Sequence, residues 1–319
     1  MADKAAIGVD VGGTTTKGGI VSRSGEVLTR VDLPTDRSAG TKSVISVVED
    51  LLQQVPDLGV QVGAIGIGAA GFVEHRAGRI TFSPNISYGD SQLKEAVSAR
   101  VDLPVTIDND ANAAAWGEYT FGAAQGSKHL ALLTLGTGIG SGFVVEGQVL
   151  RGFTGAGAEF GHTVIDPAGP QCPCGLRGCV EQFCSGLAIA REGRVAAEQD
   201  PQSSIAAFAG SLGAISAEHV GQAARQFDET ARAVLRNAGT MLGVALTNLV
   251  NVFDPEVIVL AGGLIRSGEP MLGAARDELN TRLTAQRRRP TRLDVTMLGK
   301  DIGILGAAAL ALTETGELS

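Results

Sequence analysis

Residues 159–182, EFGHTVIDPAGPQCPCGLRGCVEQ, carry the clearest chemistry in the sequence, because they hold three of the four cysteines and one of the four histidines. Thiolates with one imidazole suit a four-coordinate zinc ion. Such a set leaves no open position for water, so the metal would be structural rather than catalytic. The spacing predicts a zinc site whose ligands are His162, Cys172, Cys174 and Cys179.

The alternative for these thiols is a disulfide or a set of unpaired, buried cysteines. An odd cluster of three thiols, a spare thiol at Cys184 and the lack of a secretory signal argue for a reducing compartment. Zinc binding can supply about 10–16 kcal/mol of apparent folding free energy, enough to order a Gly- and Pro-rich segment without apolar periodicity. Glu159 and Glu181 flank the ligands, and neither is a typical zinc partner here, so we expect them to face a substrate.

The composition indicates a soluble, core-forming chain, whose 319 residues suggest about two domains. A net charge of −8 and the absence of a basic stripe argue against nucleic acid as a partner. No apolar run reaches the roughly 20 residues that span a bilayer, and the N-terminal sequence lacks a signal peptide's apolar segment. We therefore expect a cytoplasmic protein with no membrane partner. The 44 glycines, about twice average usage, indicate close approaches to the backbone.

A Gly- and Thr-rich segment, DVGGTTTK at residues 10–17, lies between two strand-like runs. A P-loop or a dinucleotide fingerprint would lead into a helix, so this pattern predicts a strand, turn, strand hairpin instead. The backbone N–H groups of such a turn can surround a phosphate, with Thr14 and Thr15 as hydroxyl donors. Asp10 can hold Mg²⁺ directly or through water. A plain hairpin turn with capping hydroxyls is the alternative.

Asp108, Asn109 and Asp110 follow a strand predicted at residues 105–107 and precede an Ala-rich helix. A carboxylate at this junction can cap the helix, which is worth about 1 kcal/mol. One residue is enough for that, so three polar residues suggest that one caps and another acts. An aspartate here would be a good general base for a substrate hydroxyl. Capping and catalysis both stay open.

The turn LGTGIG at residues 135–140 also lies between two β-type runs and repeats the organisation of the first hairpin. Two such turns would hold the phosphates of a nucleotide from both sides, with Thr137 and Gly138 on the second.

Gly263 follows a strand at residues 257–260 and would let adenine or ribose lie against bare backbone; a strand-to-helix loop is the alternative. Apolar periodicity predicts helices at residues 41–54, 230–252 and 301–312.

These motifs resemble the ROK (repressor, open reading frame, kinase) family of sugar kinases, and among them the bacterial glucokinases. DVGGTTTK, IDNDANAAAWGE, LGTGIG, EFGH, CPCGLRGCVEQ and AGG occur in the family's order and cover nearly the whole chain. The resemblance implies an α/β, actin-like ATPase (ribonuclease H-like) fold of two α/β domains with the active site in the cleft between them. The domains would be residues 1–117, joined by a C-terminal helix at 302–316, and residues 118–301 with the zinc loop.

The resemblance further implies ATP-dependent phosphorylation of the 6-hydroxyl of D-glucose, with Asp110 as the general base. The hexose would be bound by Gly71, Asn85, Asn109, Asp110, Glu159, His162 and Glu181. Mg²⁺ would be held by Asp10, and ATP by Gly12, Gly13, Thr14, Thr15, Lys17, Thr137, Gly138 and Gly263. His162 would bind zinc through one ring nitrogen and the sugar through the other.

Several related functions remain open on these residues. They are phosphorylation of N-acetylmannosamine, fructose or mannose, the use of polyphosphate as donor, a sugar-responsive ROK regulator, and a filament-forming or chaperone-like ATPase of the same fold. Regulators of the family carry a helix-turn-helix ahead of the kinase-like part, whereas the first hairpin here starts at residue 5. The cysteine loop favours ATP as the donor. We expect a homodimer or homotetramer, as is usual in this family.

Overall fold

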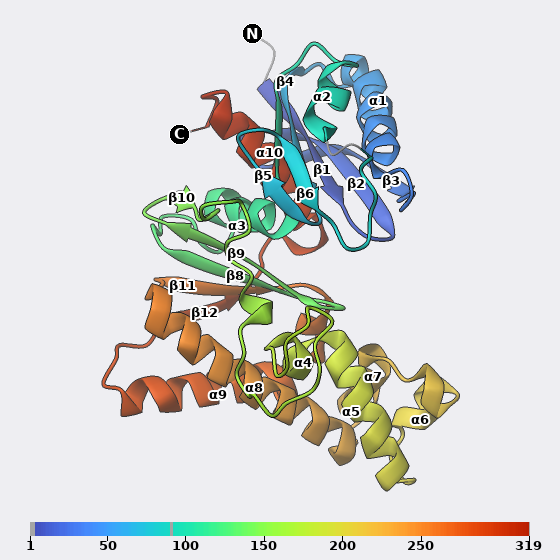
Figure 1. The fold of residues 1–319 in the computed structure, drawn as a ribbon, viewed down its shortest axis with the longest axis vertical. Coiled ribbons are helices and arrows are strands. Elements are labelled where there is room, and N and C mark those ends of the chain that lie inside the picture. The colour runs from blue at the N-terminus through green and yellow to red at the C-terminus, as the bar shows by residue number, and fades with distance from the viewer. Residues whose placement is uncertain (1–3, 90–91, 319) are drawn as a thin grey trace. The chain divides into compact units, whose positions relative to one another are not determined.

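The computed structural model describes residues 4–89 and 92–318, and the chain divides into two compact units (Figure 1). Unit 1 consists of Met1–Leu132, Gly142–Ala158 and Thr296–Ser319, and unit 2 of Leu133–Ser141 and Glu159–Val295. Each unit is therefore assembled from segments that are distant in the sequence. Within the described ranges, no helix combines the length and apolarity that a membrane crossing requires.

Unit 1 contains a five-stranded sheet in the order β3-β2-β1-β4-β7. Its strands are β1 (Lys4–Val11), β2 (Thr15–Ser22), β3 (Val27–Pro34), β4 (Gln61–Ala69) and β7 (Val105–Asn109). The predicted first hairpin is confirmed, since β1 and β2 pair antiparallel around the turn at residues 12–14. β4 is parallel to both β1 and β7, which places the carboxyl ends of these three strands at the same edge of the sheet.

Alternate residues of β1 face opposite sides of the sheet, as strand geometry requires. Ile7 and Val9 belong to the larger core, which α1 (Gly40–Leu58) covers with Val47 and Leu51. Ala6 belongs to the core of the other face, which α10 (Ile302–Glu314) covers. Helix α1 is longer than the predicted helix at residues 41–54 because its last turn continues to a left-handed glycine after Leu58.

Small residues let α10 approach the sheet very closely. Gly8 and Gly66 are partners in the β1–β4 register. A Cβ built on Gly8 would lie 2.0 Å from the carbonyl oxygen of Ile304, and one built on Gly66 would lie 1.8 Å from that of Ala307. The backbone of α10 therefore rests on two adjacent strands where neither has a side chain.

The second sheet has the order β10-β9-β8-β11-β12. When the strands of each sheet are counted along the chain, the two sheets have the same order, 3-2-1-4-5, which agrees with the predicted internal duplication. The strands are β8 (Leu130–Leu135), β9 (Ile139–Val145), β10 (Gln148–Val149), β11 (Val257–Ala261) and β12 (Arg292–Val295). The boundary between the units runs through β8 and β9.

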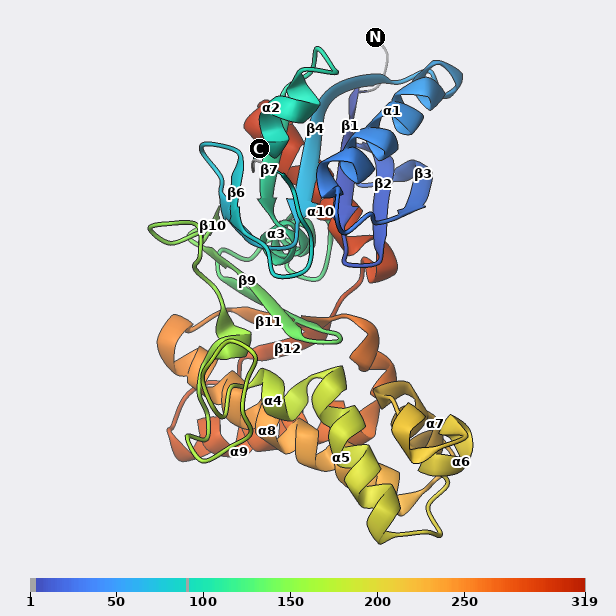
Figure 2. The ribbon, with the colours of Figure 1, turned by 45° about the vertical axis from the view of Figure 1, so that its right-hand side comes forward.

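The longest helix of unit 2, α8 (Glu229–Phe253), packs along α9 (Glu269–Ala285), as Figure 2 shows. The other described helices of unit 2 are η1 (Phe160–His162), α4 (Glu181–Cys184), α5 (Gly186–Gln199), α6 (Ile205–Ala209), η2 (Leu212–Ala214), α7 (Ala217–Arg225) and η3 (Gly263–Ser267). Unit 1 further contains the β5 (Phe72–Glu74) and β6 (Arg79–Phe82) hairpin, α2 (Leu93–Ser98), α3 (Asp110–Phe121) and η4 (Gly299–Asp301).

The close approach of α10 predicts a large difference between two glycines of β4. Gly66→Ala would push a methyl group into the backbone of α10 and should lower the free energy of unfolding by about 1–3 kcal/mol, as overpacking does. Gly63→Ala is the matched control, since nothing lies within 4 Å of its Cβ position. Chemical denaturation measures both. Equal stabilities of the two variants would contradict the close packing of α10.

Candidate functional site

Carboxylates and glycine alternate at the shared edge of the unit 1 sheet. Asp10 of β1 pairs in register with Gly68 of β4, and Gly68 pairs with Asp108 of β7. A Cβ on Gly68 would lie 3.4 Å from the Cα of Asp110. Parallel strands thus bring Asp10, Asp108 and Asp110 to one edge, with the smallest residue between them.

Burial raises the pKa of Asp110, the first residue of α3, above its usual range, although a backbone hydrogen bond from Ala111 to Oδ1 (2.9 Å) opposes the shift. Burial, followed by the charge of Asp110, raises the pKa of Asp10 to about 6, while Lys17 and Arg30 act in the opposite direction. Lys17 is the β2 partner of Asp10 in the strand register. A carboxylate with a raised pKa is a better proton acceptor, so Asp110 has the properties of a general base.

Asn109 is the residue that caps α3. Its Oδ1 accepts hydrogen bonds from the backbone N–H groups of Ala111 (2.9 Å) and Asn112 (3.1 Å), which satisfies two of the free donors at the helix start. Its Nδ2 donates to the carbonyl oxygen of Gly71 (3.0 Å). The structure therefore brings the predicted residues Asn109 and Gly71 together, and the Asn109 side chain also hydrogen-bonds to Asp110, which lowers the pKa of Asp110.

The first glycine turn is tied to the segment that follows β3. Gly12 N–H donates to the Thr15 carbonyl (3.1 Å), and Thr35 Oγ1 donates to the Gly12 carbonyl (2.7 Å). Arg37 Nε donates to the carbonyl oxygen of Gly13 (2.6 Å). Thr14 is exposed, and Thr15 and Lys17 are half-buried. Asn85 is exposed on the segment between β6 and α2.

The four predicted zinc ligands meet in one cluster of unit 2. The ligand atoms of His162, Cys172, Cys174 and Cys179 all lie within 4.8 Å of one another. The Cys174 and Cys179 sulfurs are 3.7 Å apart, and Cys172 Sγ is 3.6 Å from His162 Nδ1. A tetrahedral zinc with ordinary bond lengths separates two sulfurs by about 3.8 Å and a sulfur from a nitrogen by about 3.6 Å. All four cysteines are free, so the donor set fits a structural zinc ion.

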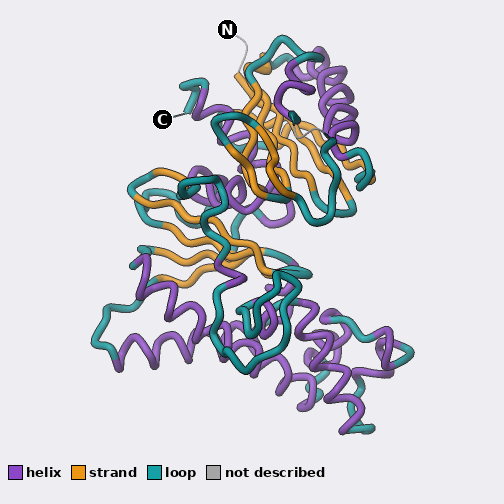
Figure 3. Tube along the Cα trace, in the orientation of Figure 1, coloured by secondary structure: helices purple, strands orange, loops and turns teal. Residues whose placement is uncertain are grey.

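The segment between β10 and α4 that carries these ligands is almost entirely loop (Figure 3). Short backbone contacts shape it, including Cys172 N–H to the Leu176 carbonyl (2.8 Å) and Val180 N–H to the Thr163 carbonyl (2.9 Å). Gly178 is left-handed, with φ of 70°. A Cβ there would lie 1.5 Å from the carbonyl oxygen of Asp166, so only glycine fits beside Cys179.

The two predicted acidic sugar ligands of unit 2 are built into the turns around the metal cluster. Glu181 begins α4, and its Oε2 accepts a hydrogen bond from the Ile139 N–H (2.9 Å). A Cβ on Gly138 would lie 2.3 Å from the same oxygen, so Gly138 supports the second turn by making room for Glu181. Glu159 is exposed and directly precedes η1, where Phe160 N–H donates to Ser141 Oγ (2.9 Å).

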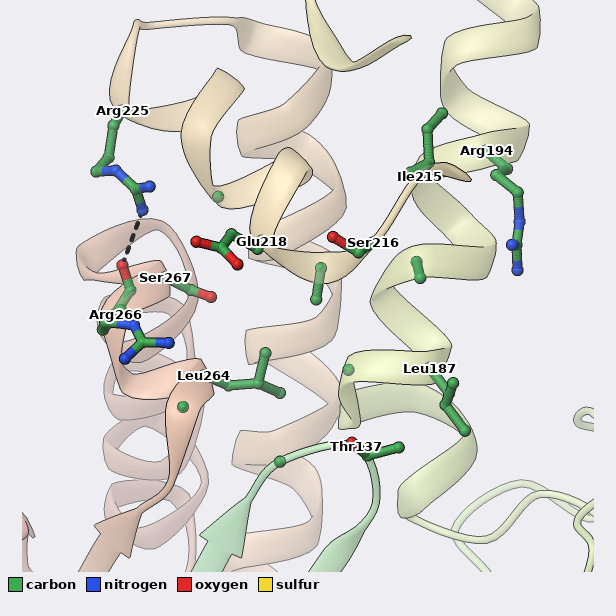
Figure 4. Close-up of a pocket in the computed structure, with 16 residues that line it drawn as sticks. Thr137, Leu187, Arg194, Ile215, Ser216, Glu218, Arg225, Leu264, Arg266 and Ser267 are labelled. Atoms are coloured by element: carbon green, nitrogen blue, oxygen red, sulfur yellow. Dashed lines mark hydrogen bonds between the residues drawn. The ribbon is translucent and has the colours of Figure 1, made fainter. Parts of the chain in front are cut away.

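A pocket of about 550 Å³ lies within unit 2 beside the second glycine turn (Figure 4). Its walls come from the turn after β8, from α5, from α7 and from η3. The side chains drawn in Figure 4 are aliphatic at Leu187, Ile215 and Leu264 and polar at Ser216 and Glu218. Three arginines also line it, Arg194, Arg225 and Arg266, and Arg225 Nη1 donates to the carbonyl oxygen of Arg266 (3.3 Å). Two of the residues predicted to bind nucleotide, Thr137 and Gly263, line this pocket, whereas Gly138 does not.

Of the residues that line this pocket, the sequence predicted only Thr137 and Gly263. Glu218 and Arg225 belong to α7 and Ser216 caps this helix, and no sequence motif marks them as ligand-binding residues.

The sequence likewise did not predict the partners of Asp108, which is only 1% exposed and pairs with Arg151 through Nε at 2.7 Å. The sequence signal for these partners was the position of Asp108 itself, a charged residue within a strand.

The repeated 3-2-1-4-5 sheets and their Gly/Thr hairpins define an actin-like, ribonuclease H-like protein of the sugar kinase type. The chain belongs to the ROK family, whose model matches residues 6–314. It is 38% identical over 311 residues to a glucokinase of Streptomyces coelicolor, covering 96% of each chain. It is 36% identical to a glucokinase of Thermotoga maritima, over 97% of this chain and 98% of the relative.

A similar solved structure is a ROK family glucokinase from Streptomyces griseus in complex with glucose and AMPPNP. It superimposes with a TM-score of 0.85 at 37% identity, over 97% of this chain and 99% of that chain. The predicted family and fold class are thereby confirmed.

The cysteine cluster predicts one zinc ion per chain. Cys174→Ser should abolish stoichiometric zinc and lower the melting temperature, because binding free energy of the metal contributes to folding. Cys184→Ser is the control, since Cys184 is buried outside the cluster. Elemental analysis and thermal denaturation measure the two effects. Active wild-type protein without zinc would show that the cysteines serve another purpose.

Proposed function

We propose that this protein is an ATP-dependent glucokinase that phosphorylates the 6-hydroxyl of D-glucose. The observation that supports this most strongly is the carboxylate of Asp110, whose pKa is raised, at the carboxyl edge of the unit 1 sheet, in a chain that matches glucokinases over nearly its full length. The structure of the Streptomyces griseus relative was solved with glucose and AMPPNP, which favours the same pair of substrates here.

In this proposal, Asp110 accepts the proton of the sugar 6-hydroxyl while the hydroxyl oxygen attacks the γ-phosphorus of ATP. The bond between that phosphorus and the bridging oxygen of ADP breaks, and glucose 6-phosphate, ADP and one proton result. Little covalent work falls to the protein in such a transfer, so positioning and charge neutralisation dominate. The raised pKa of Asp110 suits it to this role.

The nucleotide would use both glycine turns. We assign adenosine to the pocket of unit 2, where Thr137 and Gly263 line the wall and leave the backbone accessible. The phosphates would be bound by the predicted residues Gly12, Gly13, Thr14, Thr15, Lys17, Thr137 and Gly138. Mg²⁺, when bound, would neutralise phosphate charge, and Asp10 would hold it.

The hexose would be bound by Asn109, Asp110, Gly71 and Asn85 from unit 1 and by Glu159, His162 and Glu181 from unit 2. His162 turns Nδ1 toward Cys172, so its Nε2 would be the nitrogen for the sugar. Zinc then has a supporting role, because it orients the imidazole through Nδ1. We further propose a cytoplasmic homodimer or homotetramer.

Two measurements on the same preparations test the glucokinase assignment. Wild type should release ADP from ATP with glucose as the preferred acceptor, ahead of N-acetylmannosamine, fructose and mannose, and polyphosphate should not replace ATP. Asp110→Asn should lose about 10²–10⁴-fold in turnover, the contribution of general base catalysis, while calorimetry should still detect glucose binding. Asp57→Asn, an exposed carboxylate on α1, is the control. Near-normal turnover of Asp110→Asn would refute the role of Asp110.

The nucleotide assignment of the pocket has its own test. Gly263 lines the pocket, and the nearest atom to its Cβ position is an Arg266 nitrogen at 3.7 Å. Gly263→Leu should therefore fill the pocket without a backbone clash and raise KM for ATP, leaving KM for glucose unchanged. Gly213→Leu, where nothing lies within 4 Å, should affect neither. Steady-state kinetics with each substrate varied decide the question, and an unchanged KM for ATP in Gly263→Leu would exclude the pocket as the adenosine site.

A further inference from the structure

Asp108 is a buried carboxylate two residues before the proposed base, and all its contacts lie in unit 1. Its Oδ1 accepts hydrogen bonds from the Asn109 N–H (2.8 Å) and from Asn112 Nδ2 (3.0 Å). Its Oδ2 accepts one from Arg151 Nε (2.7 Å) and lies 3.5 Å from His75 Nδ1. A carboxylate that is 1% exposed needs such partners, because burying an unpaired charge costs several kcal/mol.

His75 carries a positive charge in this arrangement. Its Nδ1 is 2.8 Å from the carbonyl oxygen of Ile107, and its Nε2 is 2.7 Å from Glu314 Oε1. A carbonyl and a carboxylate are both acceptors, so both ring nitrogens must donate, which only the imidazolium form can do. Burial alone would lower the pKa of His75, but the hydrogen bond to Glu314 and the charge of Asp108 outweigh it and raise the pKa.

Three separate segments thus meet around the end of β7. His75 follows β5, Arg151 follows β10, and Glu314 is the last residue of α10. Glu314 is held on its other oxygen by Thr106 Oγ1 of β7 (3.0 Å). The cluster therefore combines two basic side chains, His75 and Arg151, with two acidic ones, Asp108 and Glu314.

The hydrogen bonds of Asp108 enclose the turn that carries the proposed base. Oδ1 binds the residue before Asp110, through Asn109 N–H, and a residue after it, through Asn112 Nδ2. The side chain of Asn109 binds the same turn, because its Oδ1 accepts hydrogen bonds from the N–H groups of Ala111 and Asn112. The position of Asp108 therefore sets the position of the Asp110 backbone, while Asp108 itself stays buried away from solvent.

We propose that Arg151, His75 and Glu314 form a charged clamp on Asp108 that holds Asp110 in the orientation needed for proton abstraction. The clamp residues are positioning residues, which act on the reaction only through the turn at residues 109–112. This inference rests on the proposed glucokinase function. Its expected size follows from the sensitivity of catalysis to geometry, since a displacement of about 1 Å can cost 10²-fold in rate.

The clamp should depend on pH through His75. The charged groups that face its ring are Asp108 from β7, Glu314 from α10 and Arg151 from the segment after β10. Because the pKa of His75 is raised in the folded protein, protonated His75 stabilises the clamp fully at pH values below its unfolded-state pKa of about 6.5. This stabilisation is lost as the pH rises through the folded-state pKa of His75. Turnover of wild type should fall over that alkaline range.

The test compares kcat, KM and pH profiles of folded variants. Arg151→Gln should lower kcat by about 10–100-fold with little change in either KM, and Arg151→Lys should recover part of the loss. His75→Gln should have a lower kcat that no longer falls over the alkaline range. The controls are Arg79→Gln, which removes an exposed pair with Glu74 at 2.6 Å, and His129→Gln, which removes one with Glu146 at 3.3 Å.

Each outcome decides the matter. Losses of kcat in Arg151→Gln and His75→Gln, absent from both controls, support the clamp. Values of kcat equal to the controls, a change in KM alone, or an unaltered alkaline limb in His75→Gln overturn it while leaving the glucokinase proposal intact. If Arg151→Gln does not fold, His75→Gln and Arg151→Lys decide by the same criteria. A wild type without glucose-dependent turnover overturns the proposed function and the clamp together.

Discussion

The organisation of unit 1 depends on the contact between the backbone of α10 and two glycines of its sheet. Gly8 and Gly66 lie side by side in β1 and β4, and each would clash with α10 if it carried a Cβ. The same helix makes room for Asp10 at Gly303, whose Cβ position is 2.4 Å from the Asp10 side chain. Removing side chains at these points costs chain entropy, and it brings a helix close enough to fix the strand ends that carry the acidic residues.

Two aspartates at the end of one strand have opposite surroundings. Asp108 accepts hydrogen bonds from Arg151 and two amide donors and lies 3.5 Å from His75, so it is well suited to a structural role. Asp110 is bound by backbone donors and an asparagine, and burial raises its pKa. The surroundings therefore suit Asp108 to holding the turn and Asp110 to accepting a proton.

The cysteine loop and the second glycine turn of unit 2 are connected through Glu181. Glu181 follows Cys179 by two residues and accepts a hydrogen bond from Ile139 N–H. Gly138 has no side chain where Glu181 approaches. A zinc ion that orders the cysteine loop would therefore also order the turn that contributes Thr137 to the pocket. The loop is more than an isolated stabilising element, because Glu181 at its end binds the second glycine turn.

Features that depend on neighbours in the chain could be predicted from the sequence. The two hairpins, the cysteine cluster and the polar cap of α3 each bring together residues no more than 17 positions apart, where spacing determines which side chains can meet. His75 and Glu314 are 239 positions apart, and Arg151 and Asp108 are 43 apart. The pocket likewise combines Thr137 with Glu218 and Arg266. Such pairings follow from strand order and helix docking, which no local pattern encodes.

The discontinuity of unit 1 has a consequence for the growing polypeptide. Ala6, Val21 and Ala64 face Ile304, Ala308 and Leu312 of α10, and this helix is translated after the whole of unit 2. The apolar face formed by the first strands therefore stays uncovered on the ribosome until α10 has been synthesised. Unit 2, apart from its short segment Leu133–Ser141, is continuous from Glu159 to Val295 and can complete its core first, so nascent chains expose an apolar sheet face while unit 2 is being made.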